Sequence, residues 1–288
     1  MSQNLGSHNL MQQLSVGNVV NVSINLYRAN LKLYFKLALI AHLWVLVPIY
    51  GWAKFYAISA LISRLAFGEL IGQPESPKTA ATHINRRLWY FFIIGVLLFI
   101  FSSFGSIILS YLIWIPLIIL LALLSFLLKI NFIDSLMTLP PVILGMLILI
   151  TTILISFWFN CRGFMTDLPL AIESNLSLFK TIRYSWDLTK LSLKRIQLII
   201  IISFLTTLPT LIINSMGGPF IIALIVGIVL PNSTENDSLI GTFYLISMIL
   251  VNGLVTMPFW QAIKAVAYYD IRCRREGWDL KLRDSLSR

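Results

Sequence analysis

The stretch that decides the fold is LWYFFIIGVLLFIFSSFGSIILSYLIWIPLIILLALLSFLL, residues 88–128, which contains no charged residue. A helical membrane span needs about 20 mostly apolar residues, because the hydrocarbon core is about 30 Å thick. Lipid offers no hydrogen-bond partner to the backbone, so an apolar run of this kind crosses a membrane as a helix. The run predicts an all-α integral membrane protein.

The composition of the whole chain supports this class. Apolar residues make up 58% of the 288 residues and charged residues only 12%, whereas about a quarter of a soluble domain is charged. The formal net charge is +10. The basic residues flank apolar runs instead of forming one basic domain, which argues against nucleic acid and favours anionic lipid headgroups at the cytoplasmic face. The expected partners are these lipids and other membrane proteins.

Eight apolar segments are candidates for membrane spans, and the basic residues between them indicate how many cross. A dense basic cluster runs from Arg162 to Arg195, and eight crossings from a cytoplasmic N-terminus would place it outside, against the positive-inside rule. We therefore predict a polytopic bundle of about six spans. The segments are Leu33–Ile49, Trp52–Leu70, Leu88–Phe104, Ile107–Leu128, Pro140–Asn160, Ile196–Ser215, Gly217–Pro231 and Leu239–Ile263.

Two of these segments are predicted to be re-entrant or short apolar helices that do not cross. Ile107–Leu128 follows a break at Gly105, and Gly217–Pro231 is short and follows a break at Gly217–Gly218. Such backbone is tolerated at membrane depth only where protein or water satisfies it. The acidic linker Asn232–Ser238 is expected outside, and the basic tail inside.

The predicted domain organisation is one membrane domain, residues 16–275, between a disordered N-terminus at 1–15 and a cytoplasmic tail at 276–288. Residues 86–162 and 195–275 share a coarse order: a basic start, a long span, a glycine break, a second apolar piece and a final span. This order suggests an internal repeat, a feature of many transporters.

Two amphipathic helices, residues 16–32 and 176–191, are expected to lie in the cytoplasmic interface. In the second helix the apolar face carries Phe179, Ile182 and Trp186. The opposite face is charged and carries Lys180, Arg183, Asp187 and Lys190. Tyr27 and Trp186 are expected at headgroup depth, where aromatic residues gather.

Polar residues inside the apolar segments are the usual functional pointers in a membrane protein. The candidates are His42, Asn160 and Asn252. For His42, a histidine hydrogen-bonded between helices is favoured over a proton relay. The sequence has no catalytic motif, no metal-ligand spacing and no nucleotide-binding glycine pattern, so we expect neither an enzyme nor a cofactor.

Two stretches resemble a bacterial membrane-protein family. Leu168–Arg195 reads LPLAIESNLSLFKTIRYSWDLTKLSLKR, and the tail Ala267–Leu280 reads AYYDIRCRREGWDL. The chain is similar here to the membrane domain fused to some glycerophosphodiester phosphodiesterases and to its stand-alone relatives, uncharacterised inner-membrane proteins. The run WAKFYAISALISRLAFGELIGQPE looks like cyanobacterial members. The resemblance implies a membrane domain of the bacterial plasma membrane, or of the thylakoid membrane, without the hydrolase activity.

The resembling stretches also suggest a structural latch between residues 176–191 and the end of the last span. Glu173 is expected to pair with the tail, and Asp270 with Arg183 or Arg272. A latch is favoured over a ligand site. The candidate structural and interaction residues are Glu173, Arg183, Trp186, Asp187, Lys190, Asp270 and Arg272.

The leading functional hypothesis is a non-enzymatic membrane protein that organises or assists other membrane components through its basic cytoplasmic face. The alternative is a transporter or lipid-handling protein built on the internal repeat, which predicts a polar cavity lined by groups such as His42, Asn160 or Asn252. An enzyme acting on phospholipid is the weakest hypothesis, because the sequence offers no paired acid and base.

Overall fold

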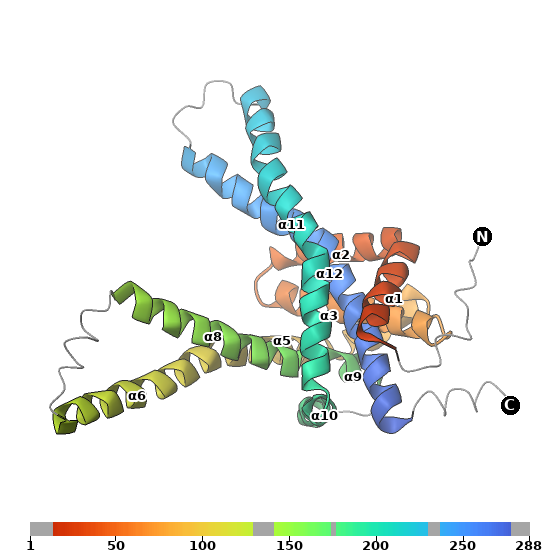
Figure 1. Ribbon diagram of the computed structural model, residues 1–288. Helices are drawn as coiled ribbons and strands as arrows, with labels where there is room; N and C mark the ends of the chain where they lie inside the picture. The colour runs from red at the N-terminus through yellow and green to blue at the C-terminus, as the bar shows by residue number, and fades with distance from the viewer. Residues whose placement is uncertain (1–13, 129–140, 174–176, 230–236, 278–288) are drawn as a thin grey trace. The chain divides into compact units, whose positions relative to one another are not determined.

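The computed structural model describes residues 14–128, 141–173, 177–229 and 237–277 (Figure 1). Within these ranges the chain forms helices and turns and no strand, which confirms the all-α prediction. The predicted disordered N-terminus, acidic linker and tail lie mostly outside the described residues. The helices are α1 (Val16–Ala29), α2 (Leu31–Val45), α3 (Tyr50–Leu70), α4 (Pro77–Asn85), α5 (Leu88–Ile100), η1 (Phe101–Gly105), α6 (Ser106–Leu128), α8 (Pro141–Gly163), α9 (Asp167–Ile172), α10 (Leu178–Lys190), α11 (Leu193–Val229) and α12 (Asp237–Glu276).

The chain divides into two compact units, and each is described by itself. Unit 1 comprises residues 1–92 and 165–288, and unit 2 comprises residues 93–164. In unit 2, α6 and α8 form a hairpin of two long helices (Figure 1). Polar side chains join α8 to α6 and to η1: Trp114 Nε1 of α6 donates to Thr151 Oγ1 at 3.3 Å, and Asn160 Nδ2 donates to Ser102 Oγ of η1 at 2.6 Å. Bonds of this kind hold helices together in lipid, where apolar burial supplies no driving force.

Three helical stretches of the described residues are long and apolar enough to cross a membrane. They are Leu88–Leu120, Gly145–Ile172 and Leu193–Ser215. The chain is therefore a candidate membrane protein with three such spans, and the prediction of six is wrong for the part of the chain that the structure describes.

The glycine breaks account for part of this correction. Leu88–Phe104 and Ile107–Leu128 form one continuous helical run, in which the π-helical turn η1 carries the chain past Gly105. The Ser106 hydroxyl donates to the Ser102 carbonyl oxygen at 2.6 Å and satisfies a backbone acceptor at the turn. Similarly, α11 continues through Gly217 and Gly218. A glycine costs a helix about 1 kcal/mol, less than the several kcal/mol of an unsatisfied backbone group in lipid.

The first two predicted spans are also not among the candidate spans. The segment Leu33–Ile49 becomes α2, which has only 15 residues, about 22 Å of helix. The segment Trp52–Leu70 becomes α3, which carries Lys54, Arg64 and Glu69 and is the central helix of unit 1, contacted by α2, α4, α9 and α12. Ser63 Oγ donates to Gln261 Oε1 of α12 at 2.6 Å within this core, and Gln261 donates in turn to Ser59.

The first predicted interfacial helix packs on protein. Helix α1 begins at an N-cap, where the Ser15 side chain accepts from the Asn18 N–H, and it ends at Ala29. Its apolar residues Val19, Val20 and Leu26 are buried where α1 contacts α11 and α12. This apolar face is therefore covered by the chain itself, and the place of α1 in the cytoplasmic interface stays a prediction. The internal repeat stays a prediction.

Candidate functional site

Asp270, near the end of α12, is completely buried and accepts hydrogen bonds from three parts of the chain. Arg195 Nε, at the start of α11, is 2.7 Å from Oδ2, and Arg274 Nε is 3.1 Å from Oδ1. The backbone N–H of Leu14 donates to Oδ1 at 3.0 Å, and both arginines also donate to the Leu14 carbonyl oxygen. We call Leu14, Arg195, Asp270 and Arg274 the Asp270 cluster; it ties the chain before α1 to α11 and α12.

The predicted partners of Asp270 were wrong. The Arg183 side chain is 89% exposed and its Nε is 4.0 Å from Asp187 Oδ2 on the same helix. Arg272 follows Asp270 by two residues, so the helix turns it toward a different side. There, Arg272 Nη1 is 3.4 Å from Glu173 Oε1, so the tail does pair with Glu173.

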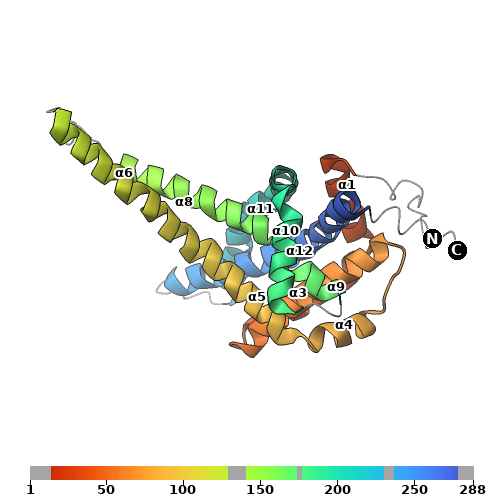
Figure 2. The same ribbon diagram turned by 90° about the horizontal axis from the view of Figure 1, so that it is seen from below.

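The segment Leu168–Glu173, which carries part of the family resemblance, is held by cations from α3 and from the turn between α4 and α5. Arg87 Nη1 donates to the Glu173 carbonyl oxygen at 2.7 Å, and Arg64 donates to that of Ala171. These carbonyls lie at the C-terminal end of α9, where the helix dipole favours positive charge. At the other end, Lys264 Nζ is 2.8 Å from Asp167 Oδ2. Helix α9 is thereby fixed against α3 and α12 (Figure 2).

Helix α10 buries small and polar side chains and exposes large apolar ones, whereas an amphipathic helix packed on a protein usually buries its apolar side. The residues it buries are small or polar, together with one leucine: Thr181, Ser185, Leu188 and Thr189. Thr166 Oγ1 donates to Ser185 Oγ at 3.2 Å across the buried side. The large apolar Phe179 faces outward and is 81% exposed, as is Leu191 just after the helix. The predicted apolar face therefore exists but is directed away from the body of unit 1.

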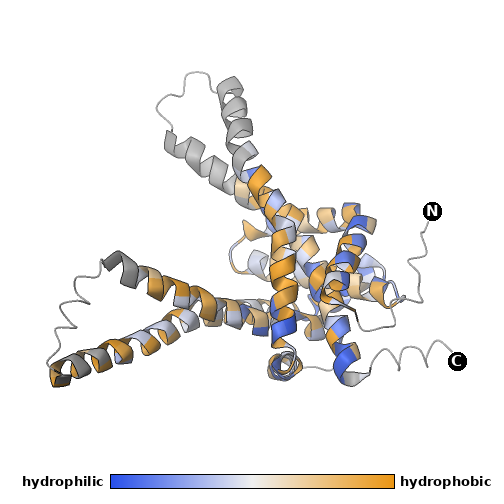
Figure 3. Cartoon of the chain, in the orientation of Figure 1, coloured by the Kyte–Doolittle hydropathy of each residue, from blue (hydrophilic) through white to orange (hydrophobic). Residues whose placement is uncertain are grey.

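Basic side chains flank this outward face. Lys180, Arg183 and Lys190 are exposed, and Trp186 is 39% exposed among them. Asp187 is also exposed, and its carbonyl oxygen accepts from Arg275 of the tail. Figure 3 shows hydrophilic residues gathered at the start of α11 and the end of α12, the same end of unit 1 as the Asp270 cluster. We call Phe179, Lys180, Arg183, Trp186 and Lys190 the α10 surface.

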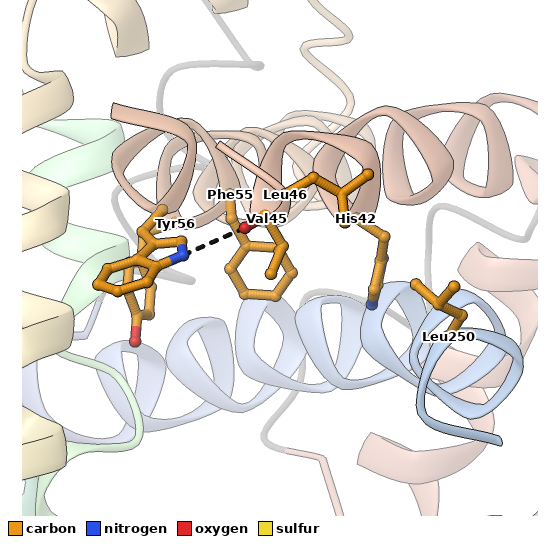
Figure 4. Close-up of a pocket in the computed structure, with 7 residues that line it drawn as sticks. His42, Val45, Leu46, Phe55, Tyr56 and Leu250 are labelled. Carbon is orange, nitrogen blue, oxygen red and sulfur yellow. Dashed lines mark hydrogen bonds between the residues drawn. The ribbon is translucent and has the colours of Figure 1, made fainter. Parts of the chain in front are cut away.

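His42 of α2 is buried beside a cavity of about 460 Å³ (Figure 4). Its Nδ1 is 2.8 Å from the Ala38 carbonyl oxygen, and because a carbonyl oxygen only accepts, Nδ1 carries the proton of this hydrogen bond. Phe55 packs edge-on against the ring, with centroids 5.4 Å apart. The histidine is thus bonded within its own helix and packed against the neighbouring one. The cavity lining is otherwise apolar and aromatic: Val45, Leu46, Trp52, Phe55, Tyr56 and Leu250.

The other two intramembrane candidates do not line this cavity. Asn160 belongs to unit 2, where it donates to Ser102. Asn252 precedes Gly253, whose backbone lies against the His42 ring, and the buried Asn252 side-chain oxygen has no hydrogen-bond partner among the described residues. The polar cavity predicted for a transporter is therefore not formed by these three residues together.

Two titratable groups, one in α3 and one beside it, have shifted pKa values. The two shifts make stability depend on pH in opposite directions. Burial, together with the positive charges of Arg64, Arg87 and Arg86, lowers the pKa of His83, and Glu75 acts against this shift. Arg64 Nη1 is 3.1 Å from His83 Nδ1, and a guanidinium can only donate, so this nitrogen must be unprotonated. Burial raises the pKa of Glu69, and a hydrogen bond from Asn30 partly offsets the shift.

Mild acid is expected to destabilise unit 1 through His83. Because the folded pKa of His83 is below its unfolded value of 6.5, its stabilising contribution is present above pH 6.5 and is lost as the pH falls through the folded pKa. Glu69 has the opposite sign: its contribution is present below its unfolded pKa of 4.5 and is lost as the pH rises through its folded pKa.

The measurement is the melting temperature of the purified protein between about pH 7.5 and 5.5, compared with His83→Gln. Glu69 is present in both proteins, so the difference between them isolates His83. The wild-type protein should lose stability more steeply on acidification than the variant. Parallel curves would show that His83 does not carry the effect.

Most of the cations that build this site were not predicted from the sequence. Arg274 follows Asp270 by four residues, the spacing of neighbours on one helix face, so this pair could have been predicted. Arg195 lies 75 residues before Asp270, and Arg87 binds carbonyl oxygens. Arg64 binds the Ala171 carbonyl oxygen in addition to its ion pair with Glu75. No local pattern in the sequence indicates either kind of contact.

The site therefore consists of a rigid set of ion pairs behind an outward-facing, basic and aromatic helix. Among the described residues, no three His, Cys, Asp or Glu side chains come together as a metal ion would require. Comparisons of the chain with protein-family models, with curated proteins and with solved structures find no match.

Proposed function

We propose that this chain is a non-enzymatic membrane protein that binds anionic lipid headgroups through the α10 surface and uses this basic face to organise other membrane components. The observation that carries the proposal is the orientation of α10. A helix that buries Thr181 and Ser185 while leaving Phe179 81% exposed gains little apolar burial from its own protein. The apolar side chain gains by entering the headgroup and upper acyl region of a membrane.

The charges of the α10 surface support an anionic membrane as the partner. Lys180, Arg183 and Lys190 lie on a helix whose only exposed acidic side chain is Asp187. Each basic residue near an anionic surface contributes about 1 kcal/mol of attraction. An aromatic side chain such as Trp186 prefers the same depth.

The latch contacts support a preformed surface. Arg275 donates to the Asp187 carbonyl oxygen, and Thr166 donates to Ser185, so α10 is held on both sides before any lipid binds. Holding a binding surface in its bound conformation reduces the entropy lost on association.

Transport and lipid handling are less well supported by the geometry. A transport site would be expected to combine polar groups at one place, whereas the cavity beside His42 is mainly apolar and Asn160 lies in unit 2. We therefore keep the organising role as the proposed function, in the bacterial plasma membrane or the thylakoid membrane.

The proposal predicts that residue 179 of α10 inserts more deeply into a membrane that contains anionic lipid than into one of neutral lipid alone. An environment-sensitive dye is attached to Phe179→Cys in the full chain, in nanodiscs of phosphatidylcholine with or without phosphatidylglycerol. Both native cysteines are buried, so the introduced thiol reacts selectively. We expect blue-shifted emission that is greater with phosphatidylglycerol and that decreases at high salt.

Charge reversal supplies the matched control. Lys180→Glu and Lys190→Glu should each reduce the preference for phosphatidylglycerol by about fivefold or more, since about 1 kcal/mol per lysine is lost. Lys78→Glu makes the same change at an exposed lysine of α4 and should leave the preference intact. Emission that does not depend on lipid charge, or that all three variants change equally, would contradict the proposal.

A further inference from the structure

The turn between α2 and α3 is an uncharged and largely exposed apolar tip. Residues 37–53 carry no charge, and Lys36 and Lys54 border them. We call residues 43–52 the α2–α3 tip. His42, the residue just before the tip, is polar but buried. The exposed large apolar residues of the tip are Leu43, Val45, Leu46, Val47, Ile49, Tyr50 and Trp52, with Leu46 at 79%.

The backbone of the tip satisfies much of its own hydrogen bonding. The N–H of Tyr50 donates to the Pro48 carbonyl oxygen at 2.7 Å, and that of Gly51 donates to the Val47 carbonyl oxygen at 3.1 Å. The Trp52 indole N–H donates to the Val45 carbonyl oxygen at 3.2 Å. Pro48 itself has no N–H to satisfy. Such a turn can leave water at a much smaller cost than an open loop.

Ile49 provides a second indication. Its φ of 60° lies in the left-handed region, which is strained for a β-branched residue. Its side chain is also 57% exposed, so packing within the chain does little to offset this strain. An apolar side chain held outward in this way is favourable where the surroundings are themselves apolar.

The contacts of Lys54 limit how far the tip can reach. Lys54 Nζ is 3.0 Å from Asn85 Oδ1, and Asn85 is followed by Arg86, Arg87 and the first residue of a candidate span at Leu88. Lys54 therefore lies on the same membrane face as the start of that span. If α2 and α3 both crossed the bilayer, Lys54 would lie on the opposite face. Tyr50 is four residues from Lys54, about 6 Å along the helix, which corresponds to a shallow insertion.

We propose that the α2–α3 tip inserts into the acyl chains of the leaflet that Asn85, Arg86 and Arg87 face, without crossing the membrane. Lys36 and Lys54 border the inserted stretch, where their ammonium groups can reach lipid phosphates. The cavity beside His42, lined by Leu46 and Trp52 of the tip, opens into the same apolar region and accommodates part of an acyl chain. The tip is distinct from the α10 surface, so neither assignment depends on the other.

The test places a single cysteine at Leu46→Cys in the full chain, with Cys161 and Cys273 replaced by Ala, in reconstituted vesicles. Thiol labelling by a membrane-impermeant reagent is measured from each side, and an attached fluorophore is exposed to lipids with a quencher at a shallow acyl position. Val47→Cys repeats the measurement one residue on. Lys78→Cys, exposed on α4, reports the water phase on the proposed side of entry.

We expect loss of labelling at the tip from both sides, together with strong shallow quenching, while Lys78→Cys is labelled and unquenched. Labelling of the tip from the side opposite to Lys78→Cys would show that α2 and α3 cross the membrane. Labelling from the same side would place the tip in water. Protection without quenching would mean that protein, such as a second copy of the chain, covers the tip. Each of these three results overturns the proposal.

Discussion

Asp270→Asn is expected to lower the free energy of unfolding by about 3 kcal/mol or more. The substitution keeps the shape of the side chain but removes its charge, and so leaves Arg195 and Arg274 without their common anion. Breaking a buried ion pair from one side costs about 3–5 kcal/mol, because an uncompensated charge remains. Asp270 is completely buried, and its carboxylate oxygens lie within 3.1 Å of both guanidinium groups. We therefore expect a loss in this range and not the small loss typical of an exposed ion pair.

The measurement is reversible unfolding of the purified protein in mixed micelles, with the melting temperature as a second readout. Asp187→Asn is the matched control, since the Asp187 side chain is exposed and its Oδ2 lies 4.0 Å from the Nε of Arg183, which is also exposed. That variant should lie within about 0.5 kcal/mol of the wild-type protein. Equal effects at the two positions would show that the Asp270 cluster does not hold the fold together.

A charge exchange distinguishes the observed cluster from the pairing that the sequence suggested. Asp270→Arg combined with Arg195→Asp should regain part of the stability that Asp270→Arg alone loses, because the opposite charges again meet. Asp270→Arg combined with Arg183→Asp should not, since Arg183 lies on the exposed face of α10. Rescue by Arg183→Asp and not by Arg195→Asp would contradict the structure.

The sequence predicted the helical class and several elements well, because hydropathy and helix periodicity are local properties. The candidate span Leu193–Ser215 begins three residues before the predicted Ile196–Ser215. The amphipathic segment 176–191 became α10, with Phe179 and Trp186 on its outward side. What the hydropathy of this helix could not indicate is which of its faces packs on protein. The answer depends on small buried side chains such as Ser185, which accepts a hydrogen bond from Thr166, the residue before α9.

The remaining errors come from contacts between distant parts of the chain. Gly105 looked like a break because glycine weakens helices, but a π-helical turn carried the helix past it. α3 looked like a lipid-facing span because it is apolar, yet most of its apolar residues after Trp52 are covered by other helices of unit 1. Periodicity does not distinguish burial in protein from burial in lipid. The partners of Asp270 were missed for a related reason, since Leu14 and Arg195 reach it through tertiary structure alone.

Gly51→Ala is the second substitution with a large expected effect. Gly51 is buried at the α2–α3 tip, and a Cβ there would overlap the Trp44 carbonyl oxygen and lie 2.9 Å from Val47 Cβ. The overlapping group is backbone, which cannot rotate away as a side chain can. The two arms of the turn would have to separate, so we expect a loss of about 3 kcal/mol, at the upper end for overpacking.

Alanine substitutions at two other glycines should change the free energy of unfolding by different amounts and so serve as comparisons. At Gly17, in the first turn of α1, no atom of the described residues lies within 4 Å of an added Cβ, so Gly17→Ala should stabilise by about 0.5 kcal/mol. At Gly253 the Cβ would overlap the end of the His42 ring, a side chain that can move once its bond to Ala38 breaks, so the loss should be intermediate. His42→Ala should then rescue Gly253→Ala but not Gly51→Ala. Unfolding measurements that place Gly51→Ala beside Gly17→Ala would show that the close approach of α2 and α3 at the tip is absent in the protein.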